Sequence, residues 1–286
     1  MFHVEQHDSH KSKFKVKDHL VSGEYFDITW NKSRTIAKTH IENIKDISLY
    51  YKSSNYDSFK NTPKSSLDII YFLVQKIMFR YKLFLIRIYL KGNKILDYGA
   101  GSGKFAAYLS KKNLKTSALE PYNKEINSQP LLNINVFKNI DDIPKSNRYD
   151  GVTLWHVLEH LKNPGQVLSE INNLLDKKGV LIIAVPNINS FDARHYNSLW
   201  AAFDVPRHIW HFTSKGIISL VESRGFKFEK KYPLFFDAFY ISYISEKHKN
   251  SSFAFIRAFF VALRSNFCAL FNKEFSSIVF IFTKSI

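Results

Sequence analysis

Short apolar runs alternate with amphipathic segments through the middle of the chain. Asn163 and Pro164 predict the start of a helix, since each residue type is favoured at that position, and Lys177 to Gly179 predict its end. Thr213 or Ser214 predicts the N-cap of another helix. The apolar runs predict strands at 94–97, 115–120, 134–137, 150–154 and 180–185. This alternation indicates an α/β fold.

The first predicted strand runs into three glycines spaced two apart, Gly99, Gly101 and Gly103. Glycines lack the β-carbons that would hold a ligand away from the backbone, and they permit a tight turn. A helix over 104–112 would then direct its N-terminal amides towards the ligand. In the dinucleotide fingerprint the third glycine stands five residues after the first, whereas here it stands four after it. The spacing therefore favours a different nucleoside-bearing ligand.

The pattern Asp97-x-Gly99-x-Gly101-x-Gly103 resembles the first motif of class I S-adenosylmethionine-dependent methyltransferases. The resemblance implies that Asp97 steadies the site. It also implies that the three glycines, Gly99, Gly101 and Gly103, face the methionine part of the cofactor, S-adenosyl-L-methionine.

Two later positions extend this resemblance. Glu120 stands 23 positions after Asp97 at the end of the next predicted strand, where a carboxylate can receive two ribose hydroxyls. The segment Trp155-His-Val-Leu-Glu-His-Leu161 is similar to one in the branch that includes ubiquinone O-methyltransferases. That similarity implies that Trp155 lies beside the adenosyl part of the cofactor.

The family resemblance implies a Rossmann-like fold, with a seven-stranded, mostly parallel sheet, helices on both faces and an antiparallel last strand. The strands that would complete the sheet lie at 226–232 and 277–283. We predict four regions along the chain. They are an N-terminal extension at 1–60, an amphipathic capping helix at 61–92, the S-adenosylmethionine-binding core at 93–190, and a substrate-side lid with sheet completion and an amphipathic helix at 191–286.

The N-terminal extension resembles the front end of bacterial methyltransferases that carry a cysteine-based zinc knuckle. The similar phrases are Val21 to Phe26 and Tyr50 to Ser58. Four thiolates at paired spacing would hold such a module, but this segment contains no cysteine. We therefore predict a metal-free remnant that is held by packing.

The charge and the cysteine content of the chain indicate which kinds of partner and which compartment to expect. The chain of 286 residues has 41 Lys and Arg against 25 Asp and Glu, a net charge of +16, which favours anionic partners. No basic block interleaved with aromatics resembles a nucleic-acid module, so we do not expect a nucleic-acid substrate. Cys268 is the single cysteine, and the first residues do not resemble a signal peptide. We expect a cytoplasmic protein, with peripheral contact to the inner face of the membrane left open.

Two hydrophobic segments, 69–90 and 253–271, are each interrupted by basic residues. Charges near the middle of a spanning helix are costly, so we expect neither segment to cross a membrane. Lys76, Arg80, Arg87 and Lys91 fall on one helical stripe. We expect core or lid packing for both segments, and interfacial membrane attachment and dimerisation are the alternatives.

Candidate catalytic groups follow Trp155. His156, Glu159 and His160 lie at i, i+3 and i+4, so one helical turn would bring them to one side. We predict His156, His160 and His208 as catalytic residues, because a histidine can accept a proton near neutral pH. Structural hydrogen bonding is one alternative.

A metal site is another alternative, although we assign no metal ligand. In ubiquinone and small-RNA O-methyltransferases a similar turn, with Glu at its first position, joins a later histidine at a divalent ion. Here His156 replaces that Glu, while Glu159 and His160 match and His208 could be the later histidine. This nitrogen-rich set would favour zinc-like ions over magnesium.

The long segment 187–211 is rich in aromatic and basic residues, which is typical of a loop that closes over a substrate. Arg207 and His208 are candidates for residues that face the acceptor, but core packing explains many of the aromatics equally well. The predicted function is methyl transfer from S-adenosylmethionine to a small-molecule or lipid-linked, anionic acceptor, at oxygen. A nucleic-acid methyltransferase and a non-catalytic adenosylmethionine-binding scaffold are the alternatives.

Overall fold

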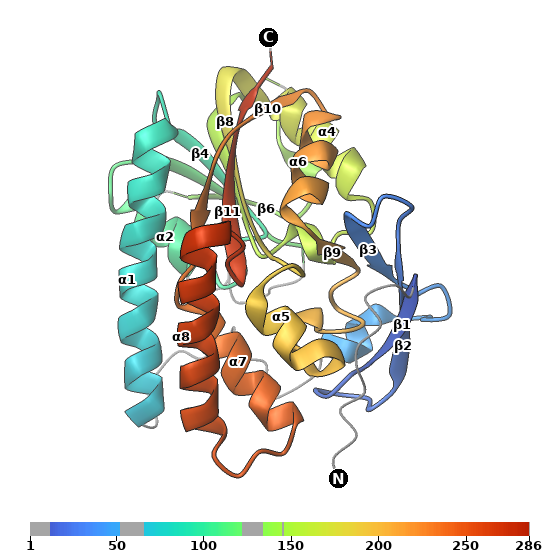
Figure 1. The fold of residues 1–286 in the computed structure, drawn as a ribbon. Helices are drawn as coiled ribbons and strands as arrows, with labels where there is room; N and C mark the ends of the chain where they lie inside the picture. Colours follow the sequence, from blue (N-terminus) through green and yellow to red (C-terminus); the bar gives the residue numbers. More distant parts are fainter. Residues whose placement is uncertain (1–11, 52–65, 122–133, 145, 286) are drawn as a thin grey trace.

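The computed structural model describes residues 12–51, 66–121, 134–144 and 146–285, which form two sheets with surrounding helices (Figure 1). The larger sheet has seven strands in the order β10-β11-β8-β7-β4-β5-β6. Their bounds are β4 Lys94–Tyr98, β5 Lys115–Leu119, β6 Asn135–Phe137, β7 Tyr149–Trp155, β8 Leu175–Pro186, β10 Phe226–Pro233 and β11 Ser277–Lys284.

Strand directions confirm the predicted fold class. The strands from β8 to β6 are parallel, and β11 pairs antiparallel with both β8 and β10. The predicted strands at 226–232 and 277–283 correspond to β10 and β11. The last strand is therefore the antiparallel one, as the resemblance implies.

Helices cover both faces of this sheet, and β8 shows why its sequence is continuously apolar. Val180, Ile182 and Ala184 pack in the cluster that contains residues of α1 (Ser66–Tyr89) and α2 (Lys104–Ser110). The alternate residues Leu181, Ile183 and Val185 pack in the cluster with α4 (Pro164–Leu174) and α6 (Ser214–Glu222). Because successive side chains point to opposite faces, a strand buried on both faces has no polar positions in this run.

The start of β8 corrects one sequence prediction. The helix α4 ends at Leu174 and the strand begins at Leu175, so Lys177 to Gly179 do not close the helix. Leu175 is buried and pairs with Tyr149, after which the register shifts to Gly151 opposite Val180. Because the Leu175 side chain is buried in the sheet, the strand begins at this residue, ahead of the charged residues 176–178.

The smaller sheet joins the N-terminal extension to the segment after β8. It contains β1 (Lys13–Lys17), β2 (Tyr25–Trp30), β3 (Ile36–Thr39) and β9 (Trp210–Phe212) in that order. Its buried residues Val16, Ile28 and Ala37 pack with Trp200 and Phe203. Packing between residues that are far apart in sequence therefore holds the extension in place.

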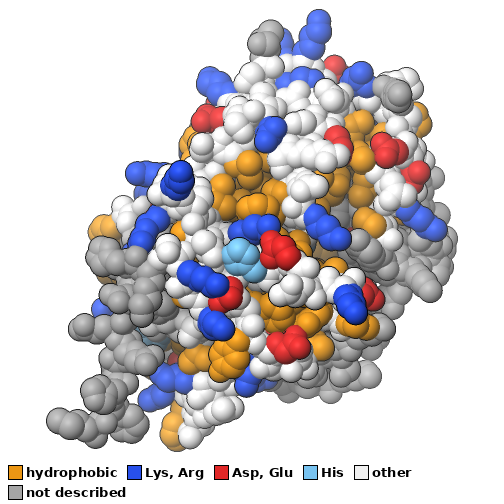
Figure 2. Space-filling view, turned by 90° about the vertical axis from the view of Figure 1, so that its right-hand side faces the viewer, with side chains coloured by type: hydrophobic (Ala, Val, Ile, Leu, Met, Phe, Trp, Pro, Cys, Tyr) orange, Lys and Arg blue, Asp and Glu red, His pale blue; other side chains and the backbone are white. Residues whose placement is uncertain are grey.

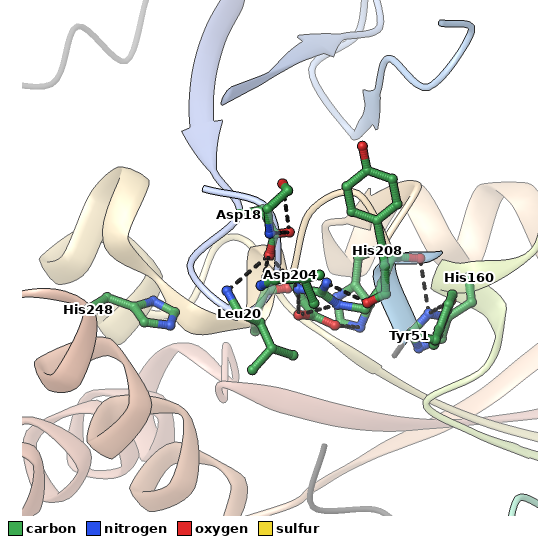
Figure 3. A network of polar contacts seen from close by, with 12 residues as sticks. Asp18, Leu20, Tyr51, His160, Asp204, His208 and His248 are labelled. Carbon is green, nitrogen blue, oxygen red and sulfur yellow. Dashed lines mark hydrogen bonds and ion pairs between the residues drawn. The ribbon is translucent and has the colours of Figure 1, made fainter. Parts of the chain in front are cut away.

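A buried ion-pair network fixes the same junction (Figure 3). The Arg207 side chain is 1% exposed, and its Nη2 lies 3.0 Å from Asp18 Oδ1 and 2.7 Å from Asp204 Oδ1. Its Nη1 donates to the Tyr50 carbonyl at 3.0 Å. The prediction that Arg207 faces the acceptor is wrong, because its guanidinium is occupied inside the protein.

The remaining helices pack together beside the larger sheet (Figure 1). They are α5 (Phe191–Tyr196), α7 (Asp237–His248) and α8 (Ala254–Asn272). The buried Asp192 carboxylate accepts hydrogen bonds from Trp200 Nε1 at 2.8 Å and from the hydroxyls of Ser265 and Ser276, each at 2.6 Å. This carboxylate therefore ties α5, α8 and the start of β11 together.

Loss of the buried Asp18 carboxylate should destabilise the fold. We expect Asp18→Ala to lower the free energy of unfolding by about 3 kcal/mol, because it leaves a buried guanidinium with one carboxylate fewer. Urea denaturation followed by circular dichroism measures the change. The control is Lys13→Ala, which removes an exposed pair with Asp27 and should cost less than about 1 kcal/mol. Equal losses in the two variants would contradict this account.

Candidate cofactor and acceptor site

A loop of three left-handed glycines follows β4. Gly99, Gly101 and Gly103 have φ angles of 73°, 55° and 72°. A β-carbon on Gly99 would collide with the Val157 side chain, whereas one on Gly101 would meet no atom of the described residues within 4 Å. Gly99 therefore allows close packing, and at Gly101 the described residues leave room for a ligand beside the backbone.

Glu120 lies at this loop. Residue Tyr98 at the end of β4 pairs in parallel with Leu119 at the end of β5, so the residues that follow each strand are neighbours. The Glu120 Oε2 atom accepts a hydrogen bond from the Gly101 amide at 2.8 Å. The structure therefore brings Glu120 to the glycine loop, where the sequence predicts it.

Asp97 lies inside the protein next to the loop. It is 3% exposed, and its Oδ1 accepts a hydrogen bond from the Thr153 hydroxyl at 2.8 Å. Burial raises the pKa of Asp97 to about 6, since a charged carboxylate is costly to bury. Its place in the interior suits a residue that supports the glycine loop from within.

Trp155 stands at the end of β7, and its indole faces a lysine from α1. Lys82 Nζ lies 4.4 Å from the centroid of the Trp155 ring. The indole N–H of Trp155 is buried and has no hydrogen-bond partner among the described residues. Burial lowers the pKa of Lys82, and the charges of Asp97 and Asp237 oppose that shift.

The turn after Trp155 departs from the predicted geometry. His156 has a left-handed φ of 57°, and only Leu158–His160 form a short 3-10 helix. His156 Nδ1 lies 3.3 Å from Glu159 Oε1, and its Nε2 lies 3.0 Å from Asp237 Oδ2. The prediction of a regular helical turn is therefore wrong, although the structure still brings His156 and His160 close to Glu159. Glu159 lies between His156 and the other histidines.

Two carboxylates set the charge of His156. Burial by itself would lower its pKa, but the hydrogen bonds and charges of Asp237 and Glu159 outweigh burial and raise the pKa to about 9. His156 is therefore a cation at neutral pH. In this state the ring holds both of its protons and cannot accept another.

His160 and His208 meet on the far side of Glu159, with ring centroids 4.5 Å apart (Figure 3). His160 Nδ1 lies 3.0 Å from the Arg207 carbonyl, and His208 Nδ1 lies 2.8 Å from the Ala202 carbonyl. Because a carbonyl only accepts, each Nδ1 must carry the proton, which leaves each Nε2 as an acceptor. Burial and the neighbouring His208 lower the pKa of His160 to about 4, so its ring is neutral at pH 7.

Glu159, His160 and His208 form a group that could hold a metal ion. One potential ligand atom from each residue lies within 4.8 Å of the others. Glu159 is 1% exposed, and its Oε2 has no hydrogen-bond partner in the described part of the chain. A buried carboxylate oxygen without a partner is costly, so a cation or a hydrogen-bond donor on a bound molecule would satisfy it.

Family comparison agrees with this geometry. Residues 73–231, more than half of the chain, match the family of methyltransferase domains. The chain belongs to this methyltransferase family. No curated protein matches the methyltransferase significantly.

Solved structures show the same fold at low sequence identity. An S-adenosylmethionine-dependent methyltransferase from Thermotoga maritima is 20% identical, with a TM-score of 0.52, over 75% of this chain and 93% of its own. Magnesium protoporphyrin IX methyltransferase from Synechocystis, bound to S-adenosylhomocysteine, is 12% identical, with a TM-score of 0.52, over 80% and 91%. Coclaurine N-methyltransferase, bound to N-methylheliamine and S-adenosylhomocysteine, is 14% identical, with a TM-score of 0.51, over 78% and 76%.

Family and fold together confirm the predicted enzyme class, a methyltransferase that uses S-adenosylmethionine. The chain's own residues fit that cofactor. The described residues leave room beside the Gly101 backbone, Glu120 offers a carboxylate next to it, and the Trp155 N–H has no partner among the described residues.

Sequence reasoning missed Lys82 and Asp237 at this site. Both come from helices outside the β4–β8 region that carries the motifs, and neither belongs to a recognisable pattern. Tyr51, whose hydroxyl lies 3.2 Å from His160 Nδ1, belongs to the phrase Tyr50 to Ser58, but that resemblance gave it no role at this site. Only the packed structure brings these three side chains to the turn after Trp155.

The raised pKa of His156 should depend on Asp237. We expect Asp237→Asn to lower that pKa from about 9 towards the ordinary 6.5, because one charged partner is lost. Since the folded pKa lies above the ordinary value, the stability that His156 contributes is complete below about pH 6.5 and is lost as pH rises through about 9.

A proton NMR titration of the His156 ring measures this pKa. Asp176→Asn removes the same charge from the opposite end of β8 and should leave the pKa unchanged. A wild-type His156 that titrates below pH 7 would contradict the assignment.

Proposed function

We propose that this methyltransferase transfers the methyl group of S-adenosylmethionine to an oxygen of a small-molecule acceptor that carries an acidic group or a lipid chain. One observation carries the proposal. The turn 155–160 begins beside the glycine loop, where Val157 packs against Gly99, and ends at the neutral His160. His160, a possible proton acceptor, therefore stands only three residues after Val157, which contacts the glycine loop.

The residues around the loop have distinct roles in holding the cofactor. Glu120 would accept the ribose hydroxyls, and Gly99, Gly101 and Gly103 would let the methionine part approach the backbone. Trp155 would place its indole beside the adenosyl part. Bound S-adenosylmethionine supplies an electrophilic methyl group.

Each of three histidines would have a separate role towards the methyl acceptor. His160 Nε2 is the candidate general base for an acceptor hydroxyl, since its Nδ1 proton is engaged by the Arg207 carbonyl. His208 lies against His160 and would orient the acceptor or share the proton. His156, a cation at neutral pH, would attract an acidic group on the acceptor.

The acceptor class is supported by charge and by the neighbours of the fold. The net charge of +16 favours an anionic molecule. The similarly folded enzymes named for coclaurine and magnesium protoporphyrin IX act on small molecules. Aromatic residues in the segment 187–211 are partly used in the small-sheet core, as Trp200 and Phe203 show. Within the segment 187–211, the proposed acceptor site is therefore supported only by His208.

Glu120 gives a direct test of cofactor binding. We expect Glu120→Gln to weaken binding of S-adenosylhomocysteine by about ten- to a hundredfold, because charge-assisted hydrogen bonds of about 1.5–3 kcal/mol are lost. Isothermal titration calorimetry measures the dissociation constant. Glu42→Gln, at an exposed carboxylate of the N-terminal extension, is the control. Wild-type protein that fails to bind S-adenosylhomocysteine would refute the proposed site.

A divalent ion is a second way to activate the acceptor, favoured by Glu159 Oε2, which has no partner within the described ranges. Glu159, His160 and His208 would hold the ion, which would polarise the acceptor oxygen. Two nitrogen ligands and one oxygen suit zinc-like ions better than magnesium. In this case His160 would act as a ligand instead of a base.

Metal analysis separates the two mechanisms. If an ion binds, protein purified without an affinity tag should contain about one zinc-like ion, and Glu159→Gln should reduce that content at least about tenfold. Mass spectrometry with inductively coupled plasma measures the content, and Glu42→Gln is again the control. Metal-free protein whose activity is unchanged by chelators would leave His160 as the general base.

A further inference from the structure

One side of the protein is formed by apolar side chains that face solvent. The helix α8 alone exposes Phe255 at 62%, Phe260 at 64%, Phe267 at 62% and Phe271 at 75% of their surface. Core packing, one part of the sequence expectation for this segment, is therefore wrong for most of its large side chains. Isolated exposed apolar residues are common, but a contiguous set indicates an interaction site.

The exposed residues of α8 continue onto neighbouring elements. Tyr81 of α1 donates to the Pro233 carbonyl, and Asn266 of α8 donates to the Phe235 carbonyl, each at 3.0 Å. The two helices therefore flank the segment 233–236, and they run side by side in Figure 1. We call this surface the apolar face. It comprises Leu73, Ile77, Phe84, Ile88, Phe235, Phe236, Tyr240, Phe255, Ile256, Phe259, Phe260, Leu263, Phe267, Leu270 and Phe271.

The way α8 is attached argues for a helix that lies along a surface. Among the described residues it is the one helix long and apolar enough to cross a membrane by length and composition. Yet it is docked on the protein through a narrow stripe of small residues, Ala258, Ala262, Ser265 and Ala269. The Ser265 hydroxyl donates to the buried Asp192. A spanning orientation would break this contact and leave the Asp192 carboxylate with one donor fewer.

The charged residues of α8 and of the described part of α1 are all basic. The sequence of α8 contains no acidic residue, and neither does the described part of α1, residues 72–89. Exposed basic residues border the face, namely Lys76, Arg80, Arg87, Arg257 and Lys273. The side of the molecule that carries β1–β3, in contrast, mixes acidic and basic side chains (Figure 2).

We propose that the apolar face docks on the surface of a lipid bilayer that contains anionic headgroups, with α8 lying in the plane of the interface. An amphipathic helix with apolar aromatics on one side and basic residues at its border is typical of such binding. The basic border complements negative lipid headgroups.

The docked face also lies close to the candidate site. Asp237, the first residue of α7, contacts His156, whereas Tyr240, about one helical turn later, is 49% exposed on the apolar face. If the proposed function holds, an acceptor drawn from the bilayer would enter at the start of α7. This last step rests on the proposed function, whereas bilayer docking does not.

Vesicle sedimentation tests the docking directly. The full-length protein should bind vesicles made of equal parts of phosphatidylcholine and phosphatidylglycerol, and should bind pure phosphatidylcholine more weakly. The double variant Phe260→Gln/Phe267→Gln should lose binding by about tenfold or more, because two apolar anchors are removed. The control Tyr25→Gln changes an equally exposed aromatic residue on β2, 65% exposed, and should bind like the wild type.

Three results would overturn the proposal. They are no binding of the wild type to the anionic vesicles, equal binding by the double variant, and a stable lipid-free dimer that the double variant converts to monomer. Sedimentation equilibrium measures the oligomeric state. Binding of S-adenosylhomocysteine is measured on the same samples. It tests the fold and the proposed function independently of bilayer docking. Retained cofactor binding without vesicle binding would reject the docking alone.

Discussion

Parallel pairing of β4 with β5 and β7 brings the ends of three strands to one edge of the sheet, and every part of the candidate site depends on that edge. The glycine loop follows β4, Glu120 follows β5 and Trp155 ends β7. Hydrogen bonds along the strands fix these positions to within a residue, since a slip of one residue would turn each side chain to the opposite face. The contact between Glu120 and the Gly101 amide is a direct result of this register.

Buried charges are the second constraint, and each is compensated in its own way. Arg207 lies between two carboxylates, whereas Asp192 is satisfied by two hydroxyls and an indole N–H. Glu159 is only partly compensated, because one of its oxygens has no partner among the described residues. A buried polar group left unsatisfied is rare and is typical of functional sites. The incomplete compensation therefore distinguishes Glu159 from Arg207 and Asp192, and Glu246 Oε2 shares it among the described residues.

The helices around the sheet differ in how much of their apolar surface is buried. Both faces of β8 are covered, so its alternate residues belong to two cores. The helix α8 is instead anchored by small side chains and the bond from Ser265 to Asp192, while its large aromatics stay outside. Apolar composition alone does not separate a core helix from an interfacial one. The difference lies in which residues form the buried stripe.

The sequence by itself determined the α/β class, the glycine loop, the place of Glu120 and the two strands that complete the sheet. These features depend on local patterns, namely strand runs, turn glycines and their spacing, which the parallel register then preserves. Tertiary structure decided the rest. Arg207 is buried by Asp18, which lies far away in sequence, and His156 is charged because α7 places Asp237 against it. Such contacts join side chains from distant segments, and their energies depend on burial, which a linear pattern does not encode.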